Sequence, residues 1–257
     1  MQGVHLEIFS QPDDTTCGPT CLQAVYAYWN DVLPLDQVIQ ECGELQEGGT
    51  LASLLGRHAL ERRYEATMYT FNLRVFDPTW FGPRGRTTVN LEQKLQAQID
   101  VKDNARLQRA CRASLEYLRR GGQVKMVDLT RRLIRDYLTR SVPILTGLSS
   151  TFLYRAAREI GPDCRSDDIH GLPVGHFVVL CGYDRRTKMV RVADPYLPNP
   201  LGPHDNYYEV SVDRVVCAIL LGALTSDANL LILKPKSVPA TGQPTGGPEH
   251  GDADRRQ

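Results

Sequence analysis

Cys17 is the residue whose type and place in the sequence most clearly suggest chemistry. It follows Thr16, a residue typical of helix N-caps, and precedes Pro19, which is tolerated in the first helical turn. The sequence therefore predicts a helix that begins near Cys17. The partial positive charge at a helix N-terminus stabilises a thiolate, which is the reactive form of cysteine. We therefore take Cys17 as the candidate nucleophile.

The predicted helix has apolar residues on one side, at the three-to-four-residue step of an amphipathic helix: Cys17, Cys21, Ala24, Val25 and Tyr28. This places Cys17 on the inward-facing side, where another part of the fold can bring a base to it. The alternative interpretation is a small buried hydrophobic residue, the usual fate of a free cysteine. We favour that alternative only for Cys21, which lies one turn deeper in the helix.

A thiol nucleophile needs a general base, and the sequence offers six histidines. His176 opens an apolar, strand-like run, so a rigid element is expected to hold its ring. His170 belongs to a polar loop and is the weaker candidate. The other histidines lie in terminal, turn-rich or charged surroundings typical of surface residues: His5, His58, His204 and His250.

The base in turn needs a group that orients it, and the oxyanion of a tetrahedral intermediate needs a hydrogen-bond donor. Asp194 ends the next strand-like run and is followed by Pro195, which ends the strand. Asp184 is the rival, but its place between the two runs is typical of a turn residue. Gln11, six residues before Cys17, can offer a side-chain N–H beside the backbone N–H of Cys17.

These four residues, in the order Gln, Cys, His, Asp, resemble the papain-like bacteriocin-processing cysteine peptidases, family thirty-nine of the cysteine peptidases, in their stand-alone form. The matching stretches are Gln11 with residues 16–22, residues 175–180 and residues 193–195. The resemblance implies that Gln11 supplies the oxyanion hole, Cys17 is the nucleophile, His176 is the acid and base, and Asp194 orients the histidine. It also implies a papain-like fold.

The activity that this resemblance implies is hydrolysis of a peptide or peptide-like amide through an acyl-thioester on Cys17. Two alternatives stay open. The same thioester can pass its acyl group to an amine or thiol, which makes an acyltransferase or transpeptidase. Less favoured is a catalytically silent module that binds peptides on a retained peptidase fold.

The sequence departs from a compact member of that family in two respects. The spacing between Cys17 and His176 is long, and residues 72–127 are the expected insertion. No nucleotide-binding glycine loop is present in the sequence, so leader-peptide removal coupled to export is not expected. The aromatic residues Phe76, Trp80 and Phe81 of the insertion either shape the substrate groove or close a local core.

Composition narrows the class of protein further. The 257 residues are 42% hydrophobic, and 30 Lys and Arg balance 30 Asp and Glu, so no net field attracts nucleic acid or a membrane. The N-terminus lacks the pattern of a signal peptide, and we expect a cytoplasmic protein. Seven cysteines without metal-ligand spacing indicate reduced thiols, and neither a metal nor a cofactor is expected.

Periodicity and breakers predict an α+β fold, with a helical first portion, a strand-rich last portion, and the helix of Cys17 packed on an antiparallel sheet. We expect one peptidase domain over residues 1–235, followed by a disordered tail at 236–257 that is rich in Pro and Gly. The expected strands are 6–9, 64–71, 143–148, 176–182, 188–193, 207–210 and 229–233. The expected helices are 17–29, 36–42, 50–63, 90–120, 128–140 and one from Ser211 toward Leu221.

A hairpin between the runs 176–182 and 188–193 makes a specific geometric prediction. Its expected register sets Leu180 opposite Val190 and His176 opposite Asp194. Directly opposed residues point to the same side of a sheet, so the two side chains are expected to be neighbours. A slip by one residue would instead send Asp194 to the other face.

Overall fold

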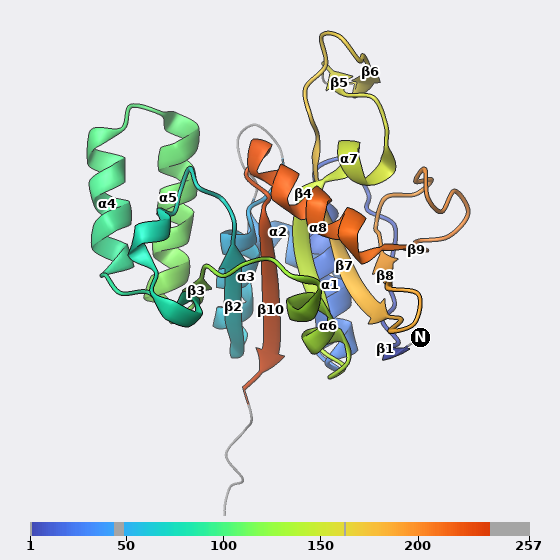
Figure 1. Cartoon of the computed structure of the whole chain (residues 1–257), viewed down its shortest axis with the longest axis horizontal. Helices are drawn as coiled ribbons and strands as arrows, with labels where there is room; N and C mark the ends of the chain where they lie inside the picture. Colours follow the sequence, from blue (N-terminus) through green and yellow to red (C-terminus); the bar gives the residue numbers. More distant parts are fainter. Residues whose placement is uncertain (1, 44–48, 162, 237–257) are drawn as a thin grey trace, which may run out of the picture.

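The structure is a computed structural model that describes residues 2–43, 49–161 and 163–236. Its centre is an eight-stranded sheet in the order β3-β2-β10-β4-β7-β8-β9, with β1 paired to β7 (Figure 1). Neighbouring strands are antiparallel except β2 and β3, which are parallel. The strands of this sheet are β1 Gln2–Gly3, β2 Tyr64–Thr70, β3 Gln123–Lys125, β4 Ile144–Ser149, β7 Gly175–Tyr183, β8 Met189–Ala193, β9 Tyr207–Ser211 and β10 Asn229–Pro235.

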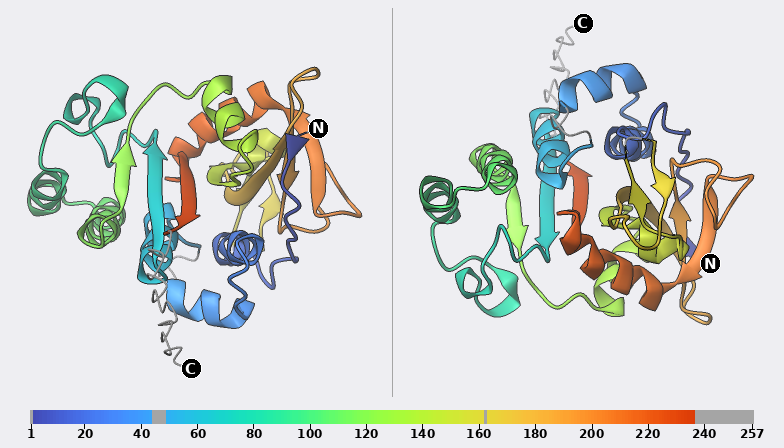
Figure 2. Two further views of the ribbon diagram at one scale, coloured as in Figure 1. Left: turned by 90° about the horizontal axis from the view of Figure 1, so that it is seen from below. Right: turned by 90° about the horizontal axis from the view of Figure 1, so that it is seen from above.

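Helices cover both faces of this sheet (Figures 1 and 2). The first three helices pack on one face, where α1 contacts β7 and α3 contacts β2, while α6 and α8 contact β4 from the other. The helices are α1 Cys17–Tyr28, α2 Leu35–Cys42, α3 Ala52–Glu61, α4 Leu91–Val101, α5 Ala105–Arg119, α6 Arg131–Leu138, α7 Ser150–Tyr154 and α8 Val212–Leu221. Short 3-10 turns occur at Pro78–Trp80, Pro83–Gly85 and Gly222–Leu224.

The two hydrophobic cores lie on opposite faces of the sheet, and β7 contributes to both. Val179 and Cys181 pack into the core beneath α1, whereas Val178 and Leu180 pack into the core beneath α8. Side chains alternate along a strand, so a strand with both faces covered is apolar throughout. The predicted α+β architecture, with the helix of Cys17 packed on a mainly antiparallel sheet, is confirmed.

Helix α1 begins at Cys17, as predicted, but its N-terminus is built differently from the expectation. Thr16 occupies the N-cap position without a side-chain capping bond, and its hydroxyl donates instead to the carbonyl oxygen of Asp13 at 3.2 Å. Every residue from Cys17 to Tyr26 is buried. The helix therefore lies inside the fold rather than on its surface, and the stripe seen in the sequence is only part of its buried surface.

The register predicted for the β7–β8 hairpin is wrong by three residues next to the turn and by two residues beyond Cys181. Near the turn, Tyr183 faces Val190, and after an irregularity at Cys181 Leu180 faces Val192. The turn lies later in the chain than expected because β7 continues to Tyr183 and Asp184 closes the loop by accepting from two backbone N–H groups. A shift of two residues preserves the face, so His176 and Asp194 still share one, although they are diagonal rather than direct neighbours.

Several other element predictions need correction. Residues 6–9 do not form a strand; β1 is Gln2–Gly3 instead. The charged stretch 90–120 is two helices, because the chain leaves the helix after Val101 and Asn104 caps α5 by accepting from the N–H of Leu107. The short strand β3 and helix α7 were not predicted. The hairpin formed by β5 Glu159–Ile160 and β6 Arg165–Ser166 was also missed.

Residues 72–127 form a layered addition beside the sheet. The helices α4 and α5 pack against each other, α5 packs on α3, and β3 extends the sheet next to β2. Phe76, Trp80 and Phe81 pack against the hydrophobic core, and Phe76 is 2% exposed. The interpretation of these aromatics as a local core is the one that fits the structure. Of the expected tail at 236–257, only Lys236 belongs to the described residues.

Tyr117 joins this addition to the sheet. Its buried hydroxyl lies 2.8 Å from the carbonyl oxygen of Ala66 in β2 and 3.0 Å from that of Gln123 in β3. Its ring fills the space that a side chain at Gly56 or Gly122 would need, since an added Cβ would lie 2.5 Å or 2.4 Å from ring atoms. The contact therefore fixes where α5 sits relative to β2 and β3.

We expect Tyr117→Phe to lower the free energy of unfolding by about 1–3 kcal/mol, because a buried carbonyl group, that of Ala66, and a part-buried one, that of Gln123, lose their shared donor. Urea denaturation followed by circular dichroism measures this change. Tyr28→Phe is the matched control, since the exposed hydroxyl of Tyr28 also donates to a carbonyl, that of Ser141. The control is expected to change the free energy by less than about 0.5 kcal/mol. Equal effects of the two substitutions would contradict the role given to Tyr117.

Candidate active site

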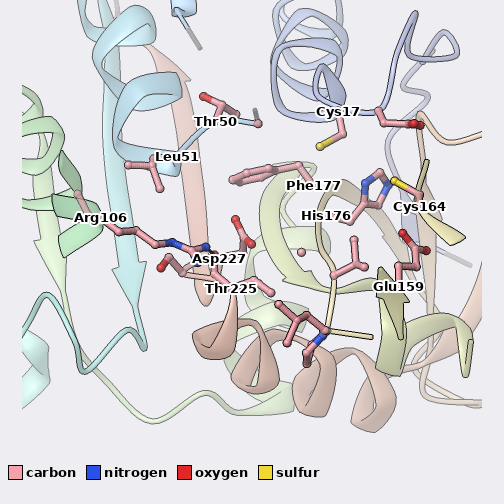
Figure 3. A pocket seen from close by; sticks show the side chains of 18 of the residues that line it. Cys17, Thr50, Leu51, Arg106, Glu159, Cys164, His176, Phe177, Thr225 and Asp227 are labelled. Carbon is pink, nitrogen blue, oxygen red and sulfur yellow. Dashed lines mark hydrogen bonds between the residues drawn. The ribbon is translucent and has the colours of Figure 1, made fainter. Parts of the chain in front are cut away.

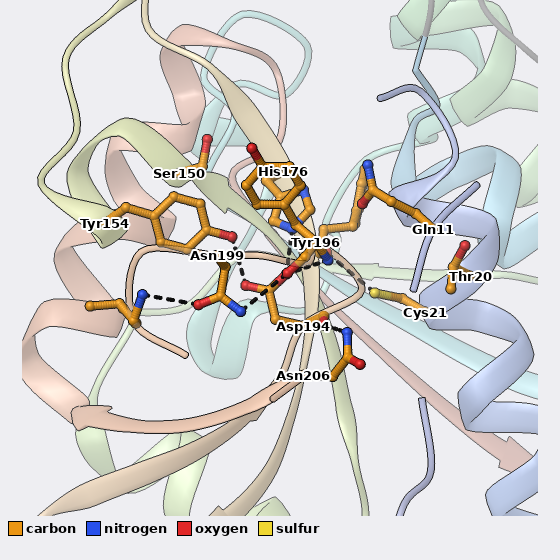
Figure 4. Close-up of polar contacts among 12 residues, drawn as sticks. Gln11, Thr20, Cys21, Ser150, Tyr154, His176, Asp194, Tyr196, Asn199 and Asn206 are labelled. Atoms are coloured by element: carbon orange, nitrogen blue, oxygen red, sulfur yellow. Dashed lines mark hydrogen bonds and ion pairs between the residues drawn. The ribbon is translucent and has the colours of Figure 1, made fainter. Parts of the chain in front are cut away.

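The structure brings the four sequence-predicted residues to the same end of the molecule, where α1 begins and β7 starts. Cys17 is the first residue of α1, and His176 is the second residue of β7. Asp194 directly follows β8, and the backbone N–H of Gln11 donates to the carbonyl oxygen of Pro195 at 2.8 Å. The segment before α1 is thus tied to the segment that carries Asp194 (Figure 4).

His176 and Asp194 form a buried pair. The Nε2 atom of His176 lies 2.8 Å from Oδ1 of Asp194, and the Asp194 residue is 0% exposed. The backbone of Asp194 is also held, because its N–H donates to the carbonyl oxygen of Asn206 and its carbonyl oxygen accepts from the amide of Asn206, both at 2.7 Å. Hydrogen bonds to the side chain and to the backbone of Asp194 together fix the carboxylate in position.

Two tyrosines complete the surroundings of Asp194, and neither was found in the sequence. The hydroxyls of Tyr154 in α7 and Tyr208 in β9 donate to Oδ2 at 2.6 Å and 2.7 Å. The N–H of Tyr196 donates to Oδ1 at 3.0 Å, and Figure 4 shows Tyr154 and Tyr196 beside Asp194. Buried and exposed residues alternate along β9, so the sequence pattern could have predicted that Tyr208 points inward. Tyr154 lies in a helix of five residues, which is too short to show a periodic pattern in the sequence.

The electrostatics of His176 favour the protonated ring. Burial acts to lower its pKa, but the carboxylate of Asp194 and the sulfur of Cys17 act in the opposite direction and raise the pKa to about 10. The same pairing holds the pKa of Asp194 below its usual range despite burial. Because Nε2 faces Asp194, Nδ1 is the ring nitrogen left to face Cys17. At neutral pH this raised pKa favours an imidazolium beside the carboxylate of Asp194.

The cysteines of the chain differ strongly in their surroundings. Cys17 is 7% exposed and lines the cavity described below, whereas Cys21 is 0% exposed and donates to the carbonyl oxygen of Phe177 at 3.3 Å. Burial raises the pKa of Cys21 well above its usual value, and it raises those of Cys42 and Cys181 to about 12. The buried-hydrophobe interpretation therefore fits Cys21, whereas Cys17 lies beside His176 at the wall of the cavity, which Cys164 of the β5–β6 hairpin also lines.

Gln11 has one of its two side-chain N–H groups engaged, since Nε2 donates to the carbonyl oxygen of Asp13 at 2.8 Å. Its Oε1 is buried and has no hydrogen-bond partner among the described residues. A primary amide carries two donor hydrogens, so a second N–H remains for another acceptor. Figure 4 shows the side chain of Gln11 near His176.

A cavity of about 410 Å³ opens beside Cys17 and His176 (Figure 3). Its walls come from distant parts of the chain: the start of α1, the segment before α3, α5, the β5–β6 hairpin with the residues that follow it, and the loop before β10. The predicted insertion contributes Arg106, Arg109 and Ala110 of α5. Phe76, Trp80 and Phe81 are not among the lining residues, so the insertion reaches the site through a helix rather than through its aromatics.

The remaining candidates lie elsewhere. Asp184 is a turn residue, as predicted, and His170 is exposed, with its ring 3.2 Å from Asp167. The prediction for His58 is wrong: this residue is 2% exposed and lies between the hydroxyl of Tyr26 at 2.8 Å and the carboxylate of Glu41 at 2.9 Å. The amphipathic pattern of α3 was correct, but His58 belongs to its buried side, where two polar partners satisfy it.

Within the described parts of the chain, no three His, Cys, Asp or Glu side chains are placed to hold a metal ion. No helix among these residues has the length and apolar character needed to cross a membrane.

No family model matches this sequence, and no curated protein does. Among solved structures, the chain is similar to a double-glycine motif protease from an AMS/PCAT transporter, crystallised with its leader peptide. The two share 16% identity with a TM-score of 0.41, over 92% of this chain and 99% of that one. It is also similar to the peptidase domain of Streptococcus ComA, a bifunctional ABC transporter involved in quorum sensing, at 12% identity and a TM-score of 0.41, over 90% and 100%.

The raised pKa of His176 makes stability depend on pH. The folded value of about 10 exceeds the ordinary value of 6.5, so the folded state binds the proton more tightly. This contribution is fully present below about pH 6.5 and is lost as the pH rises toward 10. We expect the free energy of unfolding to fall over that window by on the order of 1 kcal/mol for each unit by which the pKa is raised.

Urea titrations at intervals between pH 6 and 10 measure this slope. His176→Gln is expected to remove most of it, because the neutral amide binds no proton there. His170→Gln is the control, since His170 is exposed and its loss leaves the buried pair intact. A His176→Gln slope equal to that of the unmodified protein would contradict the assignment.

Proposed function

We propose that the protein is a cysteine peptidase that hydrolyses a peptide or peptide-like amide through an acyl-thioester on Cys17. The observation that carries this proposal is the placement of His176 beside Cys17 at the wall of a cavity, with its Nε2 atom 2.8 Å from the buried carboxylate of Asp194. An imidazolium stabilises a thiolate beside it, and a thiolate is the nucleophilic form. The motifs around Gln11, Cys17, His176 and Asp194 support the same family of peptidases.

In this mechanism the thiolate of Cys17 attacks the carbonyl carbon of the scissile amide. The tetrahedral intermediate collapses as the C–N bond breaks, and His176 gives its proton to the leaving amine. The neutral imidazole then accepts a proton from water, whose oxygen attacks the thioester and releases the carboxylic acid. This last step regenerates the thiolate and the imidazolium, so atoms and charge return to the starting state.

Gln11 and the backbone N–H of Cys17 are proposed to bind the oxyanion. The engaged N–H of Gln11 fixes its amide to the loop before α1, and the second N–H is available for an oxygen atom that develops charge beside Cys17. Asp194 is proposed to orient the ring through Nε2, with Tyr154 and Tyr208 keeping the carboxylate in place. In this proposal residues 1–235 act as one unit, and residues 72–127 are its insertion.

The first expected outcome is selective alkylation of Cys17. At neutral pH iodoacetamide is expected to modify Cys17 faster than the exposed Cys217, because Cys17 lies beside His176, whose raised pKa favours the imidazolium. Time-resolved mass spectrometry of protease fragments measures the rate at each cysteine, with Cys217 as the internal reference. His176→Gln is expected to slow Cys17 at least tenfold and leave Cys217 unchanged. Faster alkylation of Cys21, Cys111 or Cys164 would refute the nucleophile assignment.

Acyl capture separates hydrolysis from acyl transfer. The protein is mixed with a library of short peptide thioesters, with or without an added amine, and analysed by mass spectrometry. An acyl adduct on Cys17 that decays to free acid supports the peptidase, and an amine-dependent product supports an acyltransferase. A folded protein that forms no adduct, and that behaves like its Cys17→Ala variant, would leave only a peptide-binding module.

With a peptide identified in that way, Gln11→Ala is expected to lower kcat by about a hundred- to a thousandfold, the usual effect of losing one oxyanion donor. Gln11→Glu, which keeps the size of the side chain but replaces the amide, is expected to be impaired as well. Thr15→Val is the control in the same loop, since its hydroxyl contacts only Asp13. An unchanged kcat in Gln11→Ala would show that Gln11 has a structural role only.

A further inference from the structure

The cavity has a second polar end, formed by Asp227 across from Cys17 and His176. Figure 3 shows Asp227, Thr225 and Arg106 on one side of the cavity, with Phe177 between them and Cys17. Asp227 is 8% exposed, although it precedes β10 in a loop rather than lying in the sheet. Nothing in the proposed chemistry of Cys17 and His176 uses this carboxyl group.

The backbone around Asp227 is arranged to place its carboxyl group in the cavity. A Cβ atom added at Gly175 would lie 1.9 Å from Oδ2 of Asp227, and one at Gly147 would lie 2.5 Å from its carbonyl oxygen. Glycines in the two adjacent strands therefore make room for it. Ser226, directly before Asp227, has a φ of 74°, a conformation that is uncommon for residues with a side chain. Such strain is concentrated at functional positions.

Charged groups approach Asp227 from three elements of the fold. From α5, the guanidinium of Arg106 donates to the carbonyl oxygen of Thr225 at 3.1 Å, and Arg109 also lines the cavity. His176 faces it from β7, and Glu159 lines the opposite side from the β5–β6 hairpin. Burial outweighs the Thr225 hydrogen bond and the charges of Arg106 and His176, and it raises the pKa of Asp227 to about 7. A buried carboxylate of this kind gains stability from a cation brought close to it.

We propose that Asp227 is a specificity-determining residue that binds a cationic group of the substrate, an ammonium or a guanidinium, across the cavity from Cys17. The inference rests on the proposed function, because it assumes that the substrate lies between the two ends of the cavity. The inference adds a preference for positively charged substrates. Neither the family resemblance nor the residues around Cys17 indicate such a preference. Arg106 approaches Asp227 from α5, and its guanidinium is engaged by the carbonyl oxygen of Thr225 (Figure 3).

The test uses the reactivity of Cys17 with two methanethiosulfonates of similar shape. One carries a trimethylammonium group, whose charge does not titrate, and the other carries the neutral tert-butyl group in its place. In both reactions the thiolate attacks the sulfenyl sulfur, a disulfide forms, and methanesulfinate leaves. Both rates depend equally on the fraction of Cys17 that is thiolate, so this fraction drops out of their ratio. Fragmentation mass spectrometry distinguishes modification of Cys17 from modification of Cys21.

For the unmodified protein we expect the ratio of cationic to neutral rates to rise as the pH passes from 5.5 to 8.5 and Asp227 ionises. Asp227→Asn is expected to abolish that rise and to lower the ratio at pH 8.5 roughly three- to tenfold, the range expected for losing one charge at side-chain distances. Glu159→Gln is the matched control, because it removes the same charge from the more exposed hairpin, where water screens it. The control is expected to change the ratio less than about twofold.

The outcomes separate the two proposals. A Cys17 that reacts more slowly than Cys217 with both reagents would overturn the proposed function. A reactive Cys17 whose ratio is the same in Asp227→Asn, or changes equally in Glu159→Gln, would overturn the role of Asp227 alone. If Asp227→Asn does not fold, the pH dependence of the ratio in the unmodified protein decides, and a flat ratio rejects the proposal.

Discussion

The candidate site depends on keeping one carboxylate charged where water cannot reach it. Burial alone would drive Asp194 toward its neutral form, and an isolated buried charge costs many kcal/mol. Four donors prevent this: the ring of His176, the hydroxyls of Tyr154 and Tyr208, and the N–H of Tyr196. They come from β7, α7, β9 and the loop after β8. The charge state of one side chain thereby requires that all these elements be in place together.

A difference of one residue in the pairing of β7 and β8 decides whether His176 and Asp194 lie on the same face of the sheet. At the turn, the observed register would place Asp194 on the opposite face from His176, because Tyr183 is paired with Val190. The irregularity at Cys181 adds one residue to β7 and restores the shared face. β-Bulges commonly re-aim side chains next to functional sites. Here the bulge determines whether the imidazole and the carboxylate can meet.

The sequence predicted the α+β class, most element boundaries and the pairing of His176 with Asp194, because these follow from periodicity and turn chemistry. It missed Tyr154 and Asp227, since each lies in a short helix or loop whose direction is set by distant contacts. The bulge at Cys181 could not be predicted either, because β7 is a continuous apolar run in which an extra residue leaves no change of pattern. His58 was predicted to lie on the surface because it is polar, although its position in the sequence belongs to the buried side of α3.

The order of strands has a consequence for how the protein is made. The last strand of the sheet, β10, pairs with both β2 and β4, so it joins the half of the sheet that carries α3 and α5 to the half that carries His176 and Asp194. It also follows the loop that holds Asp227. A growing chain on the ribosome therefore contains Cys17 well before it contains the far wall of the cavity, which residues 225–227 supply. The cavity beside Cys17 stays incomplete until those residues and β10 have been added and have joined the two halves of the sheet.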